Sequence, residues 1–465
     1  MSQEIELGIQ AFGLNPENAI SKNNTDTQQF LSSSNDNLKI SKSNDTDLTS
    51  NATVDSISNP YYISIFLFLN SMIGSGIFNQ PYVFSQCGLV GALMIYIPAS
   101  YFTWLGLVTL TEACLVTDAI DYASAAKIAL GRWGERWVES SLLLYLFGCE
   151  LSYFLLLGQI LTELLTSWGC QTNICSQYMT TFLAAVCVIL PIASMRFFGN
   201  MGYFAMFSML MIVLCVGLVL IGGPLTSPIN HTITSLNLVN GPGMLVSGIG
   251  SVVFALGCAS NTLHIYRSSR ASERNPQSWK LVTMGATGSG LAMLLTIGMA
   301  GYFSFGSATS PFILDNFPQK WAQVFFIFVV IHLLLFIPGD LMILRYNFTK
   351  VFFGKRSDEL SPLMNQVVTF FILMCILGTV MGIVNGTDAA SGVAFSMVMN
   401  ITGGVAASSI SFILPSVLYL TVVPKHKQVH RVASFVNAGF GIAVTIAVIA
   451  TQIALPFVPM LRPYE

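Results

Sequence analysis

The sequence contains few charged side chains. Of its 465 residues, 9% are charged and 53% are hydrophobic, whereas an average soluble protein carries roughly 25% charged residues. A soluble domain needs charge on its outer surface, but a surface covered by lipid does not. The deficit therefore excludes an ordinary soluble globular protein and favours a protein embedded in a membrane.

Motifs of several functional classes are also missing. The sequence has no Walker-type phosphate loop, no Cys-x-x-Cys pair and no His-rich tract. We therefore expect neither an enzyme with catalytic residues nor a metal site or cofactor. The net charge is −2, and no basic patch interleaves with aromatic residues, so nucleic acid is not an expected partner.

Residues 1–60 differ in composition from the rest of the chain. They are rich in Ser, Asn, Asp and Thr and contain no long apolar run. Such a segment cannot bury enough apolar surface to offset its ordering entropy, so we predict a disordered cytoplasmic tail. It does not resemble a secretory signal peptide, and the apolar run from Ile63 is the expected first insertion signal.

Long apolar runs occupy residues 61–465, the predicted transmembrane domain. An α-helix needs about 20 apolar residues to cross roughly 30 Å of hydrocarbon. This criterion predicts an all-α polytopic membrane protein with about eleven spans, of which the fourth and ninth have the weakest signal. The predicted spans are 63–84, 88–116, 138–166, 177–195, 202–222, 244–266, 280–303, 320–345, 365–385, 394–421 and 435–458.

Basic residues are unevenly distributed between the loops. With the N-terminus in the cytoplasm, 18 of the 20 Lys and Arg residues fall in the tail or in inside loops, and only Lys320 and Arg462 fall outside. Cytoplasmic loops carry such an excess, and eleven spans then place the C-terminus outside. We expect a monomer in the lipid bilayer of the plasma membrane or of a lysosomal or vacuolar membrane.

The outside loops carry two candidate modifications. Asn230 and Asn385 each begin an Asn-x-Thr sequon, although similar sequons on the cytoplasmic side make this weak evidence for glycosylation. Cys170 and Cys175 share one short outside loop, in which a disulfide and two free thiols are equally open alternatives.

The first span is interrupted at Ile73, Gly74, Ser75 and Gly76, shortly before Pro81. Glycine and proline oppose a continuous helix, and lipid tolerates freed backbone groups only where they line a cavity or meet a ligand. Amides that start the second half-helix suit a carboxylate, and carbonyls that end the first suit an ammonium or another cation. Close helix packing through small residues is the alternative.

The sixth span contains a second interruption at Ala255, Leu256 and Gly257, followed by Asn261. Two interrupted spans at matching positions of two five-span units indicate inverted repeats with a site at the membrane midplane. We predict repeat one at about residues 63–222, repeat two at about 244–421 and an extra span at about 435–458.

Three motifs resemble those of one family in order and spacing. They are Asn70-Ser-Met-Ile-Gly74-Ser75-Gly76-Ile77 with Pro81-Tyr82, Gly301-Tyr302-Phe-Ser-Phe305-Gly306, and Ser411-Phe412-Ile-Leu-Pro415-Ser-Val-Leu-Tyr419. From about residue 60 onward the chain resembles the amino acid/auxin permease family, particularly its sodium-coupled neutral amino acid transporters. The resemblance implies a LeuT-like fold, spans one and six around the substrate, and a role for Asn70 in binding a coupling cation or the substrate.

The sequence departs from the family pattern in two places. In span six Cys258 precedes Ala259 where the family usually has a Cys-His pair, and the later stretch reads Leu263-His264-Ile265-Tyr266 rather than Leu-Pro-Ile-Tyr. Residues 329–338 of span eight contain no Ser or Thr, whereas sodium-using members place a hydroxyl residue in this span. This second departure weakens the expectation of sodium coupling.

Several ionisable residues fall within predicted spans, where a charge is costly. Glu112 and Glu163 lie near span ends and are expected to reach water. Glu150 in span three and Asp340 in span eight are candidates for a proton-coupling pair, because the repeat pairs these spans and one of two adjacent carboxylates holds a proton. Structural pairing, of Asp340 with Arg345 or of Glu150 with a backbone or Tyr partner, is the alternative.

Two further interior residues have open interpretations. His332 in span eight is a candidate for ion coupling, although an interior His is more often simply hydrogen-bonded. Tyr153 lies on the same helical face as Glu150, and closure over a substrate or ordinary packing explains it equally well.

Together these features predict a secondary active transporter of small, neutral L-amino acids that works by alternating access and uses a proton or sodium gradient. A receptor or sensor on the same fold, signalling through the tail, is the main alternative. A channel should show a continuous polar stripe in several spans, which the sequence lacks. The expected carboxylate site is formed by the amides of Gly74, Ser75 and Gly76, the ammonium site by carbonyls near Ile73 and at 255–257, and ion coupling by Asn70, Glu150, His332 and Asp340.

Overall fold

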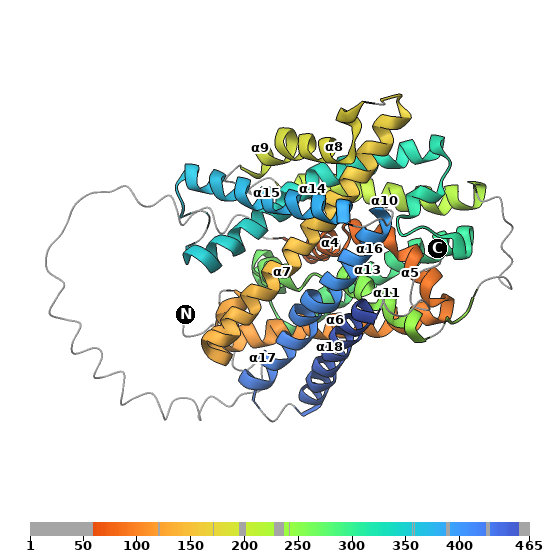
Figure 1. Cartoon of the computed structure of the whole chain (residues 1–465). Helices are drawn as coiled ribbons and strands as arrows, with labels where there is room; N and C mark the ends of the chain where they lie inside the picture. The colour runs from red at the N-terminus through yellow and green to blue at the C-terminus, as the bar shows by residue number, and fades with distance from the viewer. Residues whose placement is uncertain are drawn as a thin grey trace, which may run out of the picture. The chain divides into compact units, whose positions relative to one another are not determined.

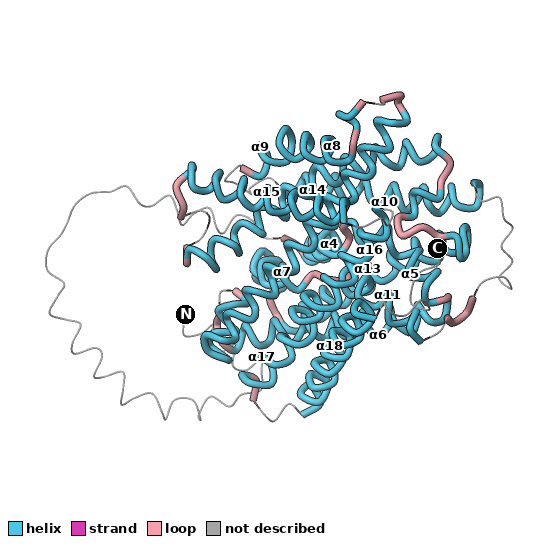
Figure 2. The backbone as a smooth tube through the Cα atoms, viewed as in Figure 1, coloured by secondary structure: helices cyan, strands magenta, loops and turns pink. Residues whose placement is uncertain are grey.

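The computed structural model describes residues 59–119, 121–170, 172–194, 201–226, 237–240, 242–355, 357, 359–386, 391–424 and 428–454. All but the last two residues of the predicted tail lie outside this part. The described chain is built of helices, with no named strand among its elements (Figure 2). The all-α class is confirmed, and its cause is that a helix satisfies its own backbone hydrogen bonds where lipid offers no partner.

The helices follow one another along the chain as Figure 1 shows. The earlier ones are α4 (Tyr61–Met72), α5 (Gln80–Cys87), α6 (Leu89–Val116), α7 (Tyr122–Ser167), α8 (Gln177–Ala184), α9 (Leu190–Ala193) and α10 (Met201–Thr226). The later ones are α11 (Pro242–Ala255), α12 (Thr262–Ser268), α13 (Pro276–Phe305), α14 (Gln319–Phe353), α15 (Pro362–Gly386), α16 (Ser391–Ile401), α17 (Leu414–Val422) and α18 (Gln428–Ala454).

Short 3₁₀ turns connect several of these helices at the points that matter for the site. The turn η1 (Ser75–Asn79) joins α4 to α5, and η5 (Ala259–Asn261) joins α11 to α12. Two more turns, η7 (Gly306–Ala308) and η8 (Ile313–Asn316), lie between α13 and α14.

Nine helical segments of the described chain are long and apolar enough to cross a membrane. The pair Tyr61–Met72 and Ser75–Cys87, bent by 59°, makes a tenth if it counts as one span. The apolar helix Gln177–Ala193 is shorter than the others and corresponds to the predicted fourth span. These lengths and compositions are those of an integral membrane protein.

Two helices extend well beyond their predicted spans. The helix α7 begins at Tyr122 rather than near residue 138 and passes through a kink at Gly131, whose φ is 70°. The helix α14 continues past residue 345 to Phe353 and ends at Gly354, whose φ is 65°. The length criterion counts apolar residues only, so it misses helix that carries charged side chains beyond the hydrocarbon.

Small residues bring α11 and the α16 region close together. A Cβ atom on Gly250 would collide with the backbone of Asn400, and one on Gly403 would collide with the backbone of Gly250. Membrane helices approach in this way because lipid provides no hydrophobic force between them, and contact between backbones must replace it.

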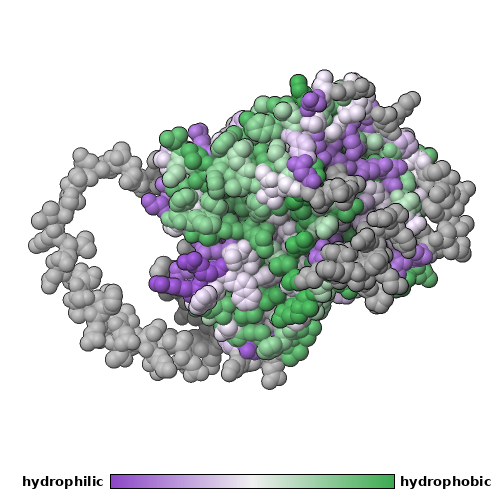
Figure 3. Space-filling view, in the orientation of Figure 1, coloured by the Kyte–Doolittle hydropathy of each residue, from purple (hydrophilic) through white to green (hydrophobic). Residues whose placement is uncertain are grey.

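Large apolar side chains also cover much of the outer surface. Met94 is 65% exposed and Leu225 is 69% exposed, and Figure 3 shows broad hydrophobic areas between smaller hydrophilic patches. A soluble protein rarely exposes so much contiguous apolar surface, whereas lipid tails can cover it.

Candidate functional site

The first span breaks where the sequence predicts. The helix α4 ends at Met72, and Gly74 has non-helical angles of φ −111° and ψ −146° before η1 begins at Ser75. The amide of Gly74 donates to the carbonyl of Met72 at 3.2 Å. The first amides of a helix have no acceptor within it, so Ser75 and Gly76 supply the amides that the start of η1 offers to a ligand.

The sixth span breaks in a corresponding way. The helix α11 ends at Ala255, and regular helix resumes only at η5 and α12. Within the break, the amide of Gly257 donates to the carbonyl of Phe254 at 3.0 Å. The carbonyl of Gly257 accepts a hydrogen bond from the hydroxyl of Tyr145 at 2.9 Å.

The two breaks lie next to each other. A Cβ atom on Gly76 would be 3.1 Å from the ring of Phe254 and 3.4 Å from the Cβ atom of Ala255. The structure therefore brings together the two interruptions that the sequence places about 180 residues apart.

The helix α7 forms a common wall for both breaks. Its residue Tyr145 bonds Gly257, as described above, and its residue Ser152 forms a hydrogen bond with Ser75 at 3.1 Å. A Cβ atom on Gly74 would lie 2.8 Å from the hydroxyl oxygen of Tyr153. Glycine at this position is thus needed for the close approach of the Tyr153 hydroxyl to the span-one break.

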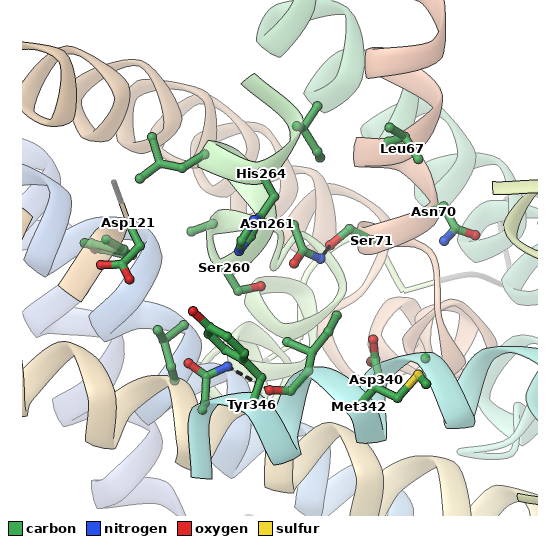
Figure 4. A pocket seen from close by; sticks show the side chains of 18 of the residues that line it. Leu67, Asn70, Ser71, Asp121, Ser260, Asn261, His264, Asp340, Met342 and Tyr346 are labelled. Atoms are coloured by element: carbon green, nitrogen blue, oxygen red, sulfur yellow. Dashed lines mark hydrogen bonds between the residues drawn. The ribbon is translucent and has the colours of Figure 1, made fainter. Parts of the chain in front are cut away.

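A cavity of about 630 Å³ opens beside the breaks and is lined by α4, α7, η5, α12 and α14. It extends from Ser71 and Ala259, next to the breaks, to Asp121 and Lys350 at one end of the bundle. Figure 4 shows Asp340 and Asn70 on one side of this space and Ser260 and His264 on another.

Only some of the predicted site residues line this cavity. Asn70, Asn261 and Asp340 belong to its wall. The others are buried and do not line it: Ile73, Gly74, Ser75, Gly76, Glu150, Tyr153, Ala255, Leu256, Gly257 and His332. The break residues are thus covered from the cavity in this conformation.

Two polar residues of the cavity wall connect the broken helices. The Asn261 side-chain amide donates to the hydroxyl of Ser71 at 2.9 Å, and Figure 4 shows the two side by side. Sequence reasoning missed Ser71, although it follows Asn70 directly. The oxygen Oδ1 of Asn70 is buried and, among the described residues, has no hydrogen-bond partner, so it is available to a cation or a substrate amine.

Of the candidate coupling pair, Asp340 lines the cavity and Glu150 does not. Glu150 is fully buried, and neither of its carboxylate oxygens has a hydrogen-bond partner in the described chain. Asp340 is close enough to act on Glu150 electrostatically, and it interacts with the hydroxyl of Tyr153. Arg345 donates to the carbonyl of Ala193 at 2.7 Å rather than to Asp340.

His332 lies in the packing between α10 and α14. It is fully buried, its Nδ1 atom is 2.6 Å from the hydroxyl of Ser208, and its ring stacks on Phe336 with centroids 5.3 Å apart. This position agrees with the interpretation of a hydrogen-bonded interior residue.

The two glutamates near span ends have polar neighbours. Glu112 forms an ion pair with Lys280 at 3.8 Å, and Glu163 accepts a hydrogen bond from Gln159 at 3.1 Å. Glu163 is partly exposed, but Glu112 is 8% exposed and buried, so the expectation that it reaches water is wrong for Glu112.

The predicted loop modifications fall partly within the described chain. Cys170 and Cys175 form a disulfide with their Cα atoms 6.3 Å apart. The side chain of Asn385 accepts a hydrogen bond from the hydroxyl of Tyr178. Asn230 lies outside the described residues.

The long apolar helices define a polytopic integral membrane protein, in which two broken helices lie beside a cavity. The sequence model of the family described as "Transmembrane amino acid transporter protein" matches residues 61–454. The chain belongs to this family.

Named relatives agree with this assignment. A protein of Danio rerio provisionally named sodium-coupled neutral amino acid transporter 11 is 23% identical over 362 residues, which cover 76% of this chain and 77% of that protein. Its Rattus norvegicus counterpart is 24% identical over 369 residues, which cover 77% of each chain. Solute carrier family 38 member 10 of Rattus norvegicus is 21% identical over 405 residues, which cover 83% of this chain and 35% of that protein.

Proposed function

We propose that this protein is a secondary active transporter that moves small, neutral L-amino acids across a membrane by alternating access, coupled to a proton or sodium gradient. The observation that carries the proposal is the adjacency of two broken helices at the end of a polar cavity. Family membership supports amino acids as the cargo, and the names of the relatives favour neutral ones.

The breaks provide complementary groups for an amino acid zwitterion. The amides of Ser75 and Gly76 at the start of η1 suit the carboxylate, because a helix N-terminus carries partial positive charge. Carbonyls at Ile73 and Ala255 suit the ammonium group. The Tyr153 hydroxyl and the Phe254 ring cover Gly74 and Gly76 in this conformation, so binding requires these side chains to move aside.

The carboxylates of Glu150 and Asp340 supply the coupling site. Among the described residues no ion pair to a basic side chain is seen for either acid, and a proton on one of them neutralises part of the charge. Asn70 offers an oxygen ligand near the first break, which suits either a coupling ion or the substrate amine. The missing span-eight hydroxyl favours the proton over sodium.

Counting Gln177–Ala193 and the bent pair as spans gives eleven crossings, arranged as two five-helix repeats and an extra helix, as in the LeuT-like fold. The N-terminus is then cytoplasmic, the C-terminus extracytoplasmic, and the cavity mouth at Asp121 and Lys350 faces the cytoplasm. The structure is then an inward-facing state. Alternating access closes the cavity mouth and opens the end of the bundle opposite to it.

Counterflow in proteoliposomes tests the proposal. The full chain is reconstituted, loaded with one unlabelled amino acid from a panel, and given the labelled form outside, with sodium replaced and pH stepped in parallel. Accumulation for small neutral amino acids that responds to pH supports the proposal. Absence of counterflow and of gradient-driven uptake under every condition overturns it.

A further inference from the structure

The segment between α13 and α14 forms part of the bundle interior. Phe312, Ile313 and Leu314 are all fully buried. The ring of Phe312 contacts Phe78 of η1 with centroids 5.8 Å apart and stacks on Phe326 of α14 at 6.4 Å. Residues 306–318 therefore plug one side of the span-one break.

This plug lies at the end of the bundle opposite the cavity mouth. The helix α14 starts after the plug and reaches the mouth with Lys350, which contacts Asp121 at 2.7 Å. The helix α13 ends at the plug. Near its start, the ring of Trp279 contacts that of Tyr266 in α12, with centroids 4.8 Å apart. For a substrate to pass, the plug has to leave the span-one break.

The side chain of Gln159 joins α7 to Asp315 of the plug. The Nε2 atom of Gln159 lies 3.3 and 3.2 Å from the two carboxylate oxygens of Asp315 and 3.1 Å from the Oε1 atom of Glu163. The hydroxyl of Ser310 donates to Asp315 at 3.3 Å. One amide group therefore stands between two carboxylates.

Charges around the cluster are of one sign in the described part of the chain. Glu163 is the charged group that acts on Asp315. Phe317, which follows η8, packs against Phe325 of α14 with ring centroids 4.8 Å apart. The side chain of Lys320, in the first turn of α14, lies outside the described residues. The carboxylates of Asp315 and Glu163, which both accept from the Gln159 amide, repel each other when both are ionised.

Asp315 lies outside the spans, in the turn η8. Its burial, together with the nearby charge of Glu163, raises the pKa of this carboxyl to about 7. A proton on either carboxyl removes the repulsion between the two charges. Loss of this proton on going to alkaline pH restores the repulsion.

We infer that Gln159, Glu163 and Asp315 form a proton-dependent latch, which holds the plug of residues 306–318 on α7 when one of the two carboxylates is protonated and releases it when both are ionised. The inference concerns regulation of the pathway proposed above and rests on it for its role in transport. The latch itself is a conformational property that can be measured without transport.

The test uses two spin labels on the purified full chain in lipid nanodiscs. Labels at Thr166→Cys and Ser307→Cys, both exposed positions, report the distance between α7 and the plug after the exposed free cysteines Cys187 and Cys375 are replaced by serine. We expect one short distance at pH 5.5 and a second, longer population that grows through about pH 7. If opening lowers the pKa of the pair by one unit, the open-to-closed ratio rises by about tenfold.

Two variants separate the latch from other pH effects. Asp315→Asn and Glu163→Gln each remove one charge from the pair. Both variants should therefore keep the short label distance up to pH 9. If one of them does not fold, the other still tests the latch. Glu135→Gln, at the other end of α7, is the matched control and should retain the wild-type pH response. A distance that ignores pH in the intact protein, or a pH response that persists in the folded variants, overturns the latch. A pH-dependent distance without any uptake would instead refute the transport proposal alone.

Discussion

The hydroxyl of Tyr145 donates a hydrogen bond to the carbonyl oxygen of Gly257 across 2.9 Å. Eight residues further along α7, the hydroxyl of Tyr153 lies against Gly74 at the other break. One helix therefore contacts both interrupted spans. A displacement of α7 has to change the surroundings of both breaks at once, which gives the site a direct route for coupling its two halves.

Tyr145→Phe tests whether this bond stabilises the break in span six. The substitution keeps the ring but leaves the carbonyl of Gly257 without this donor, and an unsatisfied buried group costs about 1–3 kcal/mol. We expect a lower melting temperature in detergent and a raised half-saturation constant in counterflow. Tyr101→Phe, at a position that is 51% exposed, should change neither. A Tyr145→Phe protein with both values unchanged would show that the bond does not support the site.

Gly74→Ala tests the close approach at the first break. The added Cβ atom would lie 2.8 Å from the hydroxyl oxygen of Tyr153, whose ring packs edge-on against Phe336 at 5.4 Å. Because the buried ring has little room to move, we expect a loss of uptake and a destabilisation of about 1–3 kcal/mol. Removing the clashing oxygen should relieve this, so the variant that also carries Tyr153→Phe should recover part of the melting temperature. Strict additivity of the two changes would exclude the contact as the cause.

Glu150→Gln tests the role of the buried carboxylates. The amide keeps the shape of the side chain but cannot carry a transported proton. We expect counterflow exchange to persist, while uphill uptake driven by a proton gradient falls to the level of an equilibrating carrier. Glu135→Gln is the control for removal of a carboxylate elsewhere on α7. Uphill uptake that survives in Glu150→Gln would exclude Glu150 as the coupling residue.

The ion pair at the cavity mouth gives a prediction about stability and pH. Partial burial raises the pKa of the Asp121 carboxyl, but hydrogen bonds from Lys350 and Ser124 outweigh this and hold the pKa below its usual value. A carboxyl of this kind stabilises the fold above its unfolded pKa of about 3.9, and the contribution is lost as pH falls through the folded pKa. Because both side chains of the ion pair are 24% exposed, we expect a contribution of about 0.2–1 kcal/mol.

Asp121→Asn removes the charge while an amide oxygen can still accept the hydrogen bond from the Ser124 amide. Its melting temperature should lie below that of the wild type by a constant amount between pH 8 and about 5, and the difference should shrink below about pH 4. A difference that grows with acidification would contradict the assigned sign.

Local sequence signals located most of the spans and the break in the first one. Gly74, Ser75 and Gly76 weaken a helix wherever they occur, and apolar length alone locates most of the membrane helices. The start of α7 was predicted poorly because the helix carries Arg132 and Arg136 before residue 138, and a criterion of apolar length excludes such charged turns. The extra helical turns leave the hydrocarbon, where charged residues are no longer excluded.

Pairings between distant residues could not be predicted in the same way. Ser71 and Asn261 are 190 positions apart, and Gln159 and Asp315 are 156 apart. Each is an ordinary polar residue with no periodicity or motif of its own. Their significance appears only when helix packing places them face to face. The pairing of Glu150 with Asp340 rests on the proposed repeat and stays a prediction.

The central claim is that the paired breaks bind and move an amino acid. The most direct measurement is uptake of a labelled small neutral amino acid into proteoliposomes containing the full chain, compared with Gly74→Ala in the same membranes. We predict saturable uptake above that of empty vesicles, which an imposed ion gradient drives and which is lost in Gly74→Ala. Uptake equal in the two proteins, or absent from the intact protein for every amino acid under both proton and sodium gradients, would contradict it.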